Sequence, residues 1–132
     1  MQKIKDNFAK QAFMKTLGAE IIQIEKGEVI ISCSKNESLT QQHGFFHAGV
    51  LTSIADSACG YAALTMMPED ADVLSVEFKI NLLRPANSDK IIATGTVLKS
   101  GRTLVICEGV VTDESETIIF AKMIGTMFVK RT

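Results

Sequence analysis

Residues 41–50, QQHGFFHAGV, and the apolar run after them hold the side chains best suited to chemistry. Asp56 is the single acid inside this run, which extends from Val50 to Met67. A carboxylate in apolar surroundings is costly unless it has hydrogen-bond donors or a chemical role, so Asp56 is a candidate functional residue. A solvent-exposed position on a less buried helix face, or a structural bond to a loop, would explain it equally well.

Asp56 shares one face of a predicted helix with small residues. At ~100° per residue, Gly49, Ser53, Asp56, Ser57 and Gly60 fall within an arc of about 100°. Small side chains leave room for a ligand or another backbone to approach closely. We therefore expect Asp56 to face a space that something else can enter.

Backbone amides at the start of this helix are candidates for electrostatic catalysis. The first N–H groups of a helix have no intrahelical acceptor, and the helix dipole places positive charge there. The amides of Ala48 and Gly49 could therefore polarise a carbonyl or hold an oxyanion. His47 could equally cap the helix or brace the loop.

Several further residues are compatible with either a structural or a functional role. Phe45 and Phe46 could anchor the loop in the core or form walls of an acyl pocket. Gln41, Gln42 and His43 fit a surface loop, and Ser75 falls on the polar side of its predicted strand. Arg84 and Arg102 stand at turns, where they could contact phosphates or simply be solvated.

The elements that position these residues follow from hydrophobic periodicity. Residues 3–16 predict an amphipathic helix, and residues 50–67 predict a second helix, apolar on most sides. Strands are predicted at the alternating or β-rich segments 19–25, 28–34, 73–83, 90–99, 102–112 and 116–130. The short spacings between the last four favour an antiparallel meander. The order predicts an α+β fold in which a curved antiparallel sheet wraps around the long helix.

Length, charge and cysteine usage limit the classes of function. The 132 residues favour a single domain, 1–132, and the net charge of −1 without a basic stripe excludes a typical nucleic-acid partner. Asp56 and the hydroxyls around it make residues 50–67 a buried helix rather than a membrane span. Cys33, Cys59 and Cys107 are expected to be buried free thiols outside any metal site. With no apolar signal segment at the N-terminus, these thiols favour the cytoplasm.

Three segments, QQHGFFHAGVLTSIADSACGYAA, VLSVEFKINLLRPA and GTVLKSGRTL, resemble the PaaI-like branch of hotdog-fold acyl-CoA thioesterases. The similarity covers residues 17–129. The family pattern is Asn, then six residues later His-Gly-Gly, and an acid nine residues after that His. Here His47 and Asp56 match the His and the acid, Gln41 takes the Asn place, and Ala48 replaces the first Gly.

The resemblance implies a hotdog fold and hydrolysis of an acyl-CoA thioester, with no metal and no cofactor, since coenzyme A is part of the substrate. Asp56 would be the general base or the nucleophile, and the Ala48 amide would polarise the carbonyl beside His47. Gln41 or Gln42, with Ser75, would orient the water. The residues expected to bind substrate are Gly49, Phe45, Phe46, Ser53, Arg84 and Arg102.

The same resemblance implies a homodimer that pairs again into a dimer of dimers, a homotetramer, with each site shared between two subunits. Two other functions stay open from the sequence. Hotdog domains also serve as non-catalytic acyl-CoA-binding modules, and hotdog enoyl-CoA hydratases or dehydratases use an acid and a histidine as well. The sequence does not name the acyl group.

Overall fold

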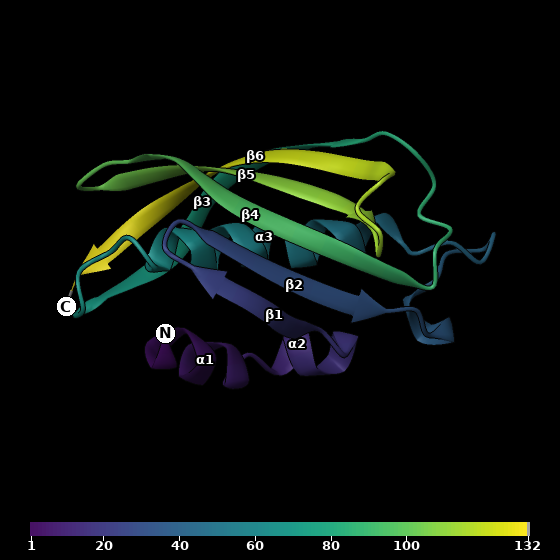
Figure 1. Cartoon of the computed structure of the whole chain (residues 1–132), viewed down its shortest axis with the longest axis horizontal. Helices are drawn as coiled ribbons and strands as arrows, with labels where there is room; N and C mark the ends of the chain where they lie inside the picture. Colours follow the sequence, from purple (N-terminus) through teal and green to yellow (C-terminus); the bar gives the residue numbers. More distant parts are fainter. Residues whose placement is uncertain (132) are drawn as a thin grey trace.

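The computed structural model describes residues 1–131, and Thr132, which the predicted domain includes, lies outside the described residues. A single curved antiparallel sheet wraps around one long helix, α3 (Ala48–Leu64), and two short helices lie at the N-terminal end of the chain (Figure 1). The predicted α+β architecture of about six strands around a central helix is confirmed.

The six strands do not follow one another in the sheet as they do in the chain. They are β1 (Glu20–Glu25), β2 (Glu28–Ser34), β3 (Ala71–Leu82), β4 (Lys90–Ser100), β5 (Leu104–Asp113) and β6 (Ile119–Arg131). Their order in the sheet is β1-β2-β4-β5-β6-β3. The predicted meander is therefore correct for β4 to β6 and wrong for β3, which pairs with β6 and forms an edge of the sheet.

Helix α3 is enclosed because its side chains are small and apolar where the sheet approaches. Ile54, Ala55, Ala58 and Cys59 are fully buried. Gly95 of β4 faces the α3 backbone so closely that an added Cβ would collide with Ala58. The sheet therefore fixes the position of the helix and of Asp56 on it. No helix within residues 1–131 is long and apolar enough to cross a membrane.

The predicted helix over residues 3–16 is two helices, α1 (Gln2–Ala9) and α2 (Ala12–Leu17). Gln11, with extended backbone dihedrals of −79° and 98°, interrupts them and precedes the first residue of α2. The Nζ of Lys3 on α1 donates to the carbonyl oxygens of Glu69 and Ala71, both at 2.6 Å. This contact ties the N-terminal helices to the connection between α3 and β3.

The alternation predicted for β3 is broken by a β-bulge. The pairing register of β3 with β6 shifts between Ser75 and Glu77. Before the bulge, Leu74 points outward and is 52% exposed, while the Ser75 hydroxyl approaches the buried Met127 sulfur at 3.4 Å. The prediction that Ser75 lies on the polar side of its strand is therefore wrong: the bulge turns this hydroxyl toward α3.

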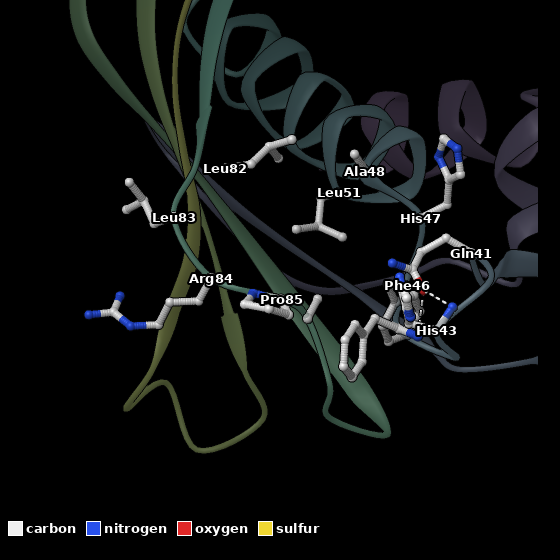
Figure 2. A pocket seen from close by; sticks show the side chains of 12 residues that line it. Gln41, His43, Phe46, His47, Ala48, Leu51, Leu82, Leu83, Arg84 and Pro85 are labelled. Atoms are coloured by element: carbon white, nitrogen blue, oxygen red, sulfur yellow. Dashed lines mark hydrogen bonds between the residues drawn. The ribbon is translucent and has the colours of Figure 1, made fainter.

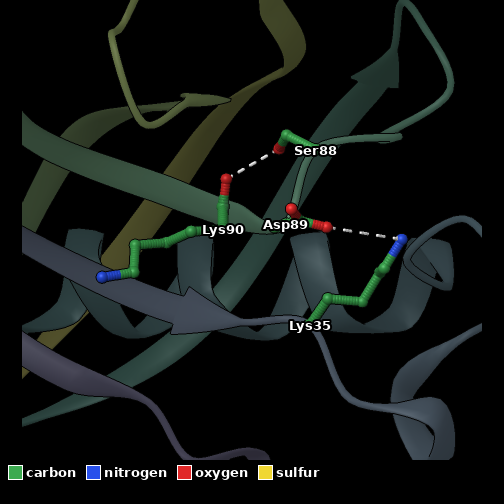
Figure 3. A network of polar contacts seen from close by, with 4 residues as sticks. All are labelled: Lys35, Ser88, Asp89 and Lys90. Carbon is green, nitrogen blue, oxygen red and sulfur yellow. Dashed lines mark hydrogen bonds and ion pairs between the residues drawn. The ribbon is translucent and has the colours of Figure 1, made fainter.

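Two loops meet near the N-terminal end of α3. The backbone N–H of Phe46 donates to the Ala86 carbonyl at 3.0 Å, and the N–H of Lys35 donates to the Asp89 carbonyl at 2.7 Å. The side chains of Lys35 and Asp89 also form an ion pair of 3.9 Å, next to the Ser88 hydroxyl bonded to the Lys90 carbonyl (Figure 3). These contacts hold the segment before α3 against the segment that joins β3 to β4. A 3₁₀ turn, η1 (Glu37–Leu39), lies between β2 and α3.

The three cysteines are free and buried, as predicted. The Cys107 thiol donates to the Cys59 carbonyl at 3.4 Å, inside the contact between β5 and α3. Burial raises the pKa of the Cys107 thiol to about 12 and also raises that of Cys59. These thiols are therefore unreactive packing groups in the folded chain.

Candidate active site

A pocket of about 500 Å³ opens where the loop before α3 meets the segment after β3 (Figure 2). Its walls are mostly apolar, with a few polar groups at the rim. The lining residues are Gln41, His43, Phe45, Phe46, His47, Ala48, Leu51, Leu82, Leu83, Arg84, Pro85 and Ala86. We refer to it as the loop pocket.

Gln41 shapes the loop with one end of its side chain and leaves the other end available. Its Oε1 accepts the backbone N–H groups of His43, at 2.6 Å, and Phe45, at 3.2 Å (Figure 2). Gly44 completes this turn with a φ of 81°, which glycine adopts without strain. Because the oxygen is occupied, Gln41 can offer a ligand only its amide hydrogens. Gln42 is exposed and does not line the loop pocket.

His47 caps α3, and its capping bond leaves the Ala48 amide free. The His47 Nδ1 accepts the N–H of Gly49 at 2.8 Å, and its backbone is extended. Within residues 1–131 the N–H of Ala48 has no hydrogen-bond acceptor. This amide stands at the positive end of the 17-residue helix α3 and lines the loop pocket, so it can polarise a carbonyl oxygen.

Asp56 lies in a second, smaller pocket further along α3. The Ser75 hydroxyl donates to Asp56 Oδ1 at 2.7 Å. Burial raises the pKa of the Asp56 carboxyl above its ordinary value, and the bond from Ser75 opposes that rise. This pocket, of about 280 Å³, is lined by Asn7, Gln11, Asp56, Ser57, Gly60, Tyr61, Asp72, Val73, Leu74 and Ser75. We refer to it as the aspartate pocket.

The two pockets have no lining residue in common. Ala48 and Asp56 lie on the same straight element, eight residues apart. At ~1.5 Å per residue this is about 12 Å along the helix axis. One substrate carbonyl cannot lie within hydrogen-bond reach of the Ala48 amide and also be next to the Asp56 carboxylate of the same chain.

The sequence pattern of the thioesterase superfamily matches residues 43–120, more than half of the chain. The chain belongs to the thioesterase superfamily. The matched segment includes His47, Ala48, Asp56 and Ser75, and it extends from the loop pocket to the beginning of β6.

Relatives with known structures have the same fold as this thioesterase. A thioesterase family protein from Silicibacter pomeroyi is 41% identical, with a TM-score of 0.95 over 99% of this chain and 98% of that one. The PaaI protein of E. coli, from the phenylacetic acid degradation operon, is 22% identical, with a TM-score of 0.88 over 97% and 91%. The predicted hotdog fold is confirmed.

One curated relative has a defined reaction. The 1,4-dihydroxy-2-naphthoyl-CoA hydrolase of Listeria monocytogenes is 28% identical over 80% of this chain and 85% of that protein. The prediction that this chain is a thioester hydrolase is confirmed by its family.

Only some of the other residues predicted to bind substrate lie in the loop pocket. Phe45, Phe46 and Arg84 line the loop pocket, where Phe46 is 3% exposed and also anchors the loop in the core. Ser53 instead donates to the Gly49 carbonyl at 2.7 Å. Gly49 and Ser53 line a different pocket, of about 390 Å³, between α2, η1 and α3 rather than the loop pocket.

Arg102 is placed apart from both pockets. It lies exposed at the turn between β4 and β5, where its carbonyl accepts from Arg131 at 3.0 Å, and it lines neither pocket. Its assignment as a substrate-binding residue stays a prediction without geometric support in one chain.

Sequence reasoning overlooked three residues that line the aspartate pocket with Asp56. These are Asn7, Gln11 and Tyr61. Asn7 and Gln11 are four residues apart, and this spacing could have indicated a polar face on the N-terminal helix. The single tyrosine in the sequence, within the apolar run, was a second available signal.

Proposed function

We propose that this thioesterase hydrolyses an acyl-CoA thioester to a free acid and coenzyme A, with Asp56 as its essential acid. The observation that carries the proposal is the half-buried Asp56 carboxylate, bonded to Ser75 and facing a pocket on the central helix. The defined reaction of the Listeria relative, hydrolysis of a CoA thioester, supports this substrate class.

The chemistry requires a nucleophile at the carbonyl carbon and a stabilised oxyanion. As a general base, Asp56 takes a proton from water, the hydroxide oxygen bonds to the carbonyl carbon, and the carbon–sulfur bond breaks. The thiolate of coenzyme A then receives the proton, so that acid and thiol are the products. As a nucleophile, Asp56 would instead form a mixed anhydride, which water hydrolyses. Both routes use the same carboxylate and the same oxyanion donor.

Ser75 and Gln41 are proposed to orient the water. The Ser75 hydroxyl uses its hydrogen on Asp56, so its oxygen can accept from a water molecule. The Gln41 amide group can donate to the oxygen of that water, because the amide oxygen is already bonded to the loop. The Ala48 amide would hold the developing oxyanion.

A second copy of the chain is required to complete such a site. The distance of about 12 Å along α3 separates Ala48 from Asp56 in one chain. We propose a homodimer in which the loop pocket of one subunit faces the aspartate pocket of its partner. The edge strand β3 is the natural contact, because it carries exposed apolar side chains, including Val76 at 56% and Phe78 at 41%.

The geometry of β3 fits this arrangement. Ser75, in the aspartate pocket, and Leu82, in the loop pocket, lie toward opposite ends of the strand. Two β3 strands that pair antiparallel about a two-fold axis near Phe78 would place Leu82 of one chain beside the Ser75 region of the other. Each dimer would then have two equivalent sites, and the dimer of dimers would follow by a further contact.

The loop pocket is the proposed entrance for coenzyme A. Its apolar walls, with Phe45 and Phe46, suit the pantetheine arm, and Arg84 stands at its rim. The Arg84 Nη1 donates to the Ile119 carbonyl at 2.9 Å, which holds the guanidinium in place while its other hydrogens stay available for a phosphate.

The test measures the thiol released from short, medium, long and aromatic acyl-CoAs by the wild type and by Asp56→Asn. We expect at least one substrate to be hydrolysed and the variant to lose most turnover. Turnover of Asp56→Asn near that of the wild type would contradict the assignment. Tight acyl-CoA binding without hydrolysis would favour a binding module, and absorbance of the enoyl group would reveal hydration.

Asp56→Asn also supplies its own folding control. Burial raises the Asp56 pKa above its value in the unfolded chain, so the contribution of this group to stability falls as pH rises through that range. Asn carries no charge, so the variant should be at least as stable as the wild type at neutral pH. A thermal unfolding curve distinguishes lost chemistry from lost structure.

A further inference from the structure

Three residues that line the aspartate pocket with Asp56 form a hydrogen-bonded chain of side chains. The Gln11 Nε2 donates to the Tyr61 hydroxyl at 2.7 Å, and the Tyr61 hydroxyl donates to Asn7 Oδ1 at 2.9 Å. The Asn7 Nδ2 approaches Asp72 Oδ1 at 3.4 Å. We call Asn7, Gln11 and Tyr61 the polar wall.

The polar wall is held rigidly by the packing around it. Tyr61 is 3% exposed, and its ring packs edge-on against Phe8 with centroids 5.8 Å apart. Lys3 ties α1 to the carbonyls of Glu69 and Ala71. The N-terminal helices therefore present fixed polar groups to the pocket rather than a flexible surface.

The distance from Asp56 to the polar wall sets the size of the group that the pocket can take. The pocket follows α3 from Asp56 past Gly60 to Tyr61. Five residues of helix correspond to about 7.5 Å. A volume of about 280 Å³ lies below the ~300–1,000 Å³ range of pockets for drug-sized ligands. A short acyl chain or one substituted ring fits this volume.

The chemistry of the polar wall sets the polarity of that group. Gln11, which lines the pocket, uses one amide hydrogen on Tyr61, so its second amide hydrogen and its Oε1 can bond to a ligand. An apolar acyl end would displace water from these groups and replace none of its hydrogen bonds, which is unfavourable. An acyl end with a hydroxyl group would replace them.

We propose that Asn7, Gln11 and Tyr61 determine acyl specificity, and that they select short acyl groups with a hydrogen-bonding group at the end distant from the thioester. This inference rests on the proposed function for the position of the thioester beside Asp56. It assigns to the N-terminal helices a role in substrate choice, in addition to their packing on the sheet.

The test compares two matched pairs of substrates. One pair is hexanoyl-CoA and its terminally hydroxylated analogue, and the other is phenylpropanoyl-CoA and its para-hydroxylated analogue. For the wild type, kcat/KM should favour the hydroxylated member of at least one pair by roughly tenfold or more. Tyr61→Phe and Gln11→Met should bring that ratio close to one, chiefly by lowering kcat/KM for the hydroxylated member.

Gln23→Met is the matched control, because Gln23 is exposed on β1 and lies outside the aspartate pocket. This variant should keep the wild-type ratio. If the wild type hydrolyses acyl-CoAs without preferring either hydroxylated member, or if the ratio is unchanged in both wall variants, the inference is wrong while the proposed function stands.

A binding measurement tests the specificity of the polar wall independently of hydrolysis. If no acyl-CoA is hydrolysed, the proposed function fails, and the same ratios are then taken from dissociation constants by calorimetry. A preference for the hydroxylated member that disappears in Gln11→Met would support the polar wall even in a binding module. Equal affinities for both members would overturn it.

Discussion

The smallest group in the proposed chemistry is a single backbone hydrogen, that of the Ala48 amide. The His47 Nδ1 accepts the N–H of Gly49, so the N–H of Ala48 is left without an acceptor among the described residues and can bond to a ligand. The Ala in place of the family's Gly retains this hydrogen. The proposed oxyanion donor is therefore a property of the helix start rather than of any side chain.

Ala48→Pro tests this donor because proline has no amide hydrogen and its ring methylene takes that place. Proline is favoured at the first helical position, and the extended backbone of His47, at −63° and 141°, suits a residue before proline. We expect a fall in kcat of about 10²–10³-fold, with a melting temperature close to that of the wild type. Ala48→Ser, which keeps the N–H, is the control. An unchanged kcat in Ala48→Pro would exclude the amide from the reaction.

Ser75→Ala tests the hydrogen bond to Asp56 through the pH dependence of the reaction. The bond stabilises the carboxylate and so lowers its pKa against the effect of burial. Its removal raises the Asp56 pKa, so the carboxylate of the variant becomes protonated at a higher pH than that of the wild type. The acidic limb of kcat/KM should therefore shift to higher pH. Ser57→Ala, in the same pocket, should leave the limb in place; a shift to lower pH in Ser75→Ala would contradict the account.

At the scale of elements, α3 is positioned by residues that have almost no side chain. Gly95 allows β4 to approach the backbone of Ala58 and Cys59. At Gly60, on α3 itself, an added methyl group would come no closer than 4.0 Å to Val73. The two glycines therefore differ in what they contribute to the fold.

Gly95→Ala and Gly60→Ala should have opposite effects on stability. We expect Gly95→Ala to lower the free energy of unfolding by about 1–3 kcal/mol or more, because the helix must move away from the sheet. Gly60→Ala should raise it by up to ~1 kcal/mol, since alanine is the better helix former. Urea denaturation measures both changes. Equal stability of Gly95→Ala and the wild type would show that α3 is not held by this contact.

The elements differ in how far the sequence determines them. The long apolar run was sufficient to predict α3, and β-rich segments separated by short turns were sufficient to predict β4 to β6. Strict alternation failed at the bulge in β3, where one extra residue turns Ser75 toward Asp56. The pairing of β3 with β6 and the contact of Gln11 with Tyr61, 50 residues apart, depend on tertiary structure that no local pattern encodes.

At the scale of the whole molecule, the two pockets are complementary halves of one site only in the proposed homodimer. The loop pocket contains Ala48, the proposed oxyanion donor, and the proposed entrance for coenzyme A, and the aspartate pocket contains Asp56 and the polar wall. The sequence pattern linked His47 to Asp56 through their spacing of nine residues. It gave no physical reason for two subunits, whereas the proposal of a dimer rests on the length of helix between the two groups.

The measurement that tests this central claim most directly is complementation between two inactive variants. Asp56→Asn and Ala48→Pro, each inactive alone, are mixed, denatured and refolded together. A heterodimer then has one site with both changes and one site with neither. Because half of the dimers are mixed, about a quarter of wild-type activity should return. No recovery in refolded, dimeric protein would place both groups of each site in one chain and contradict the shared site.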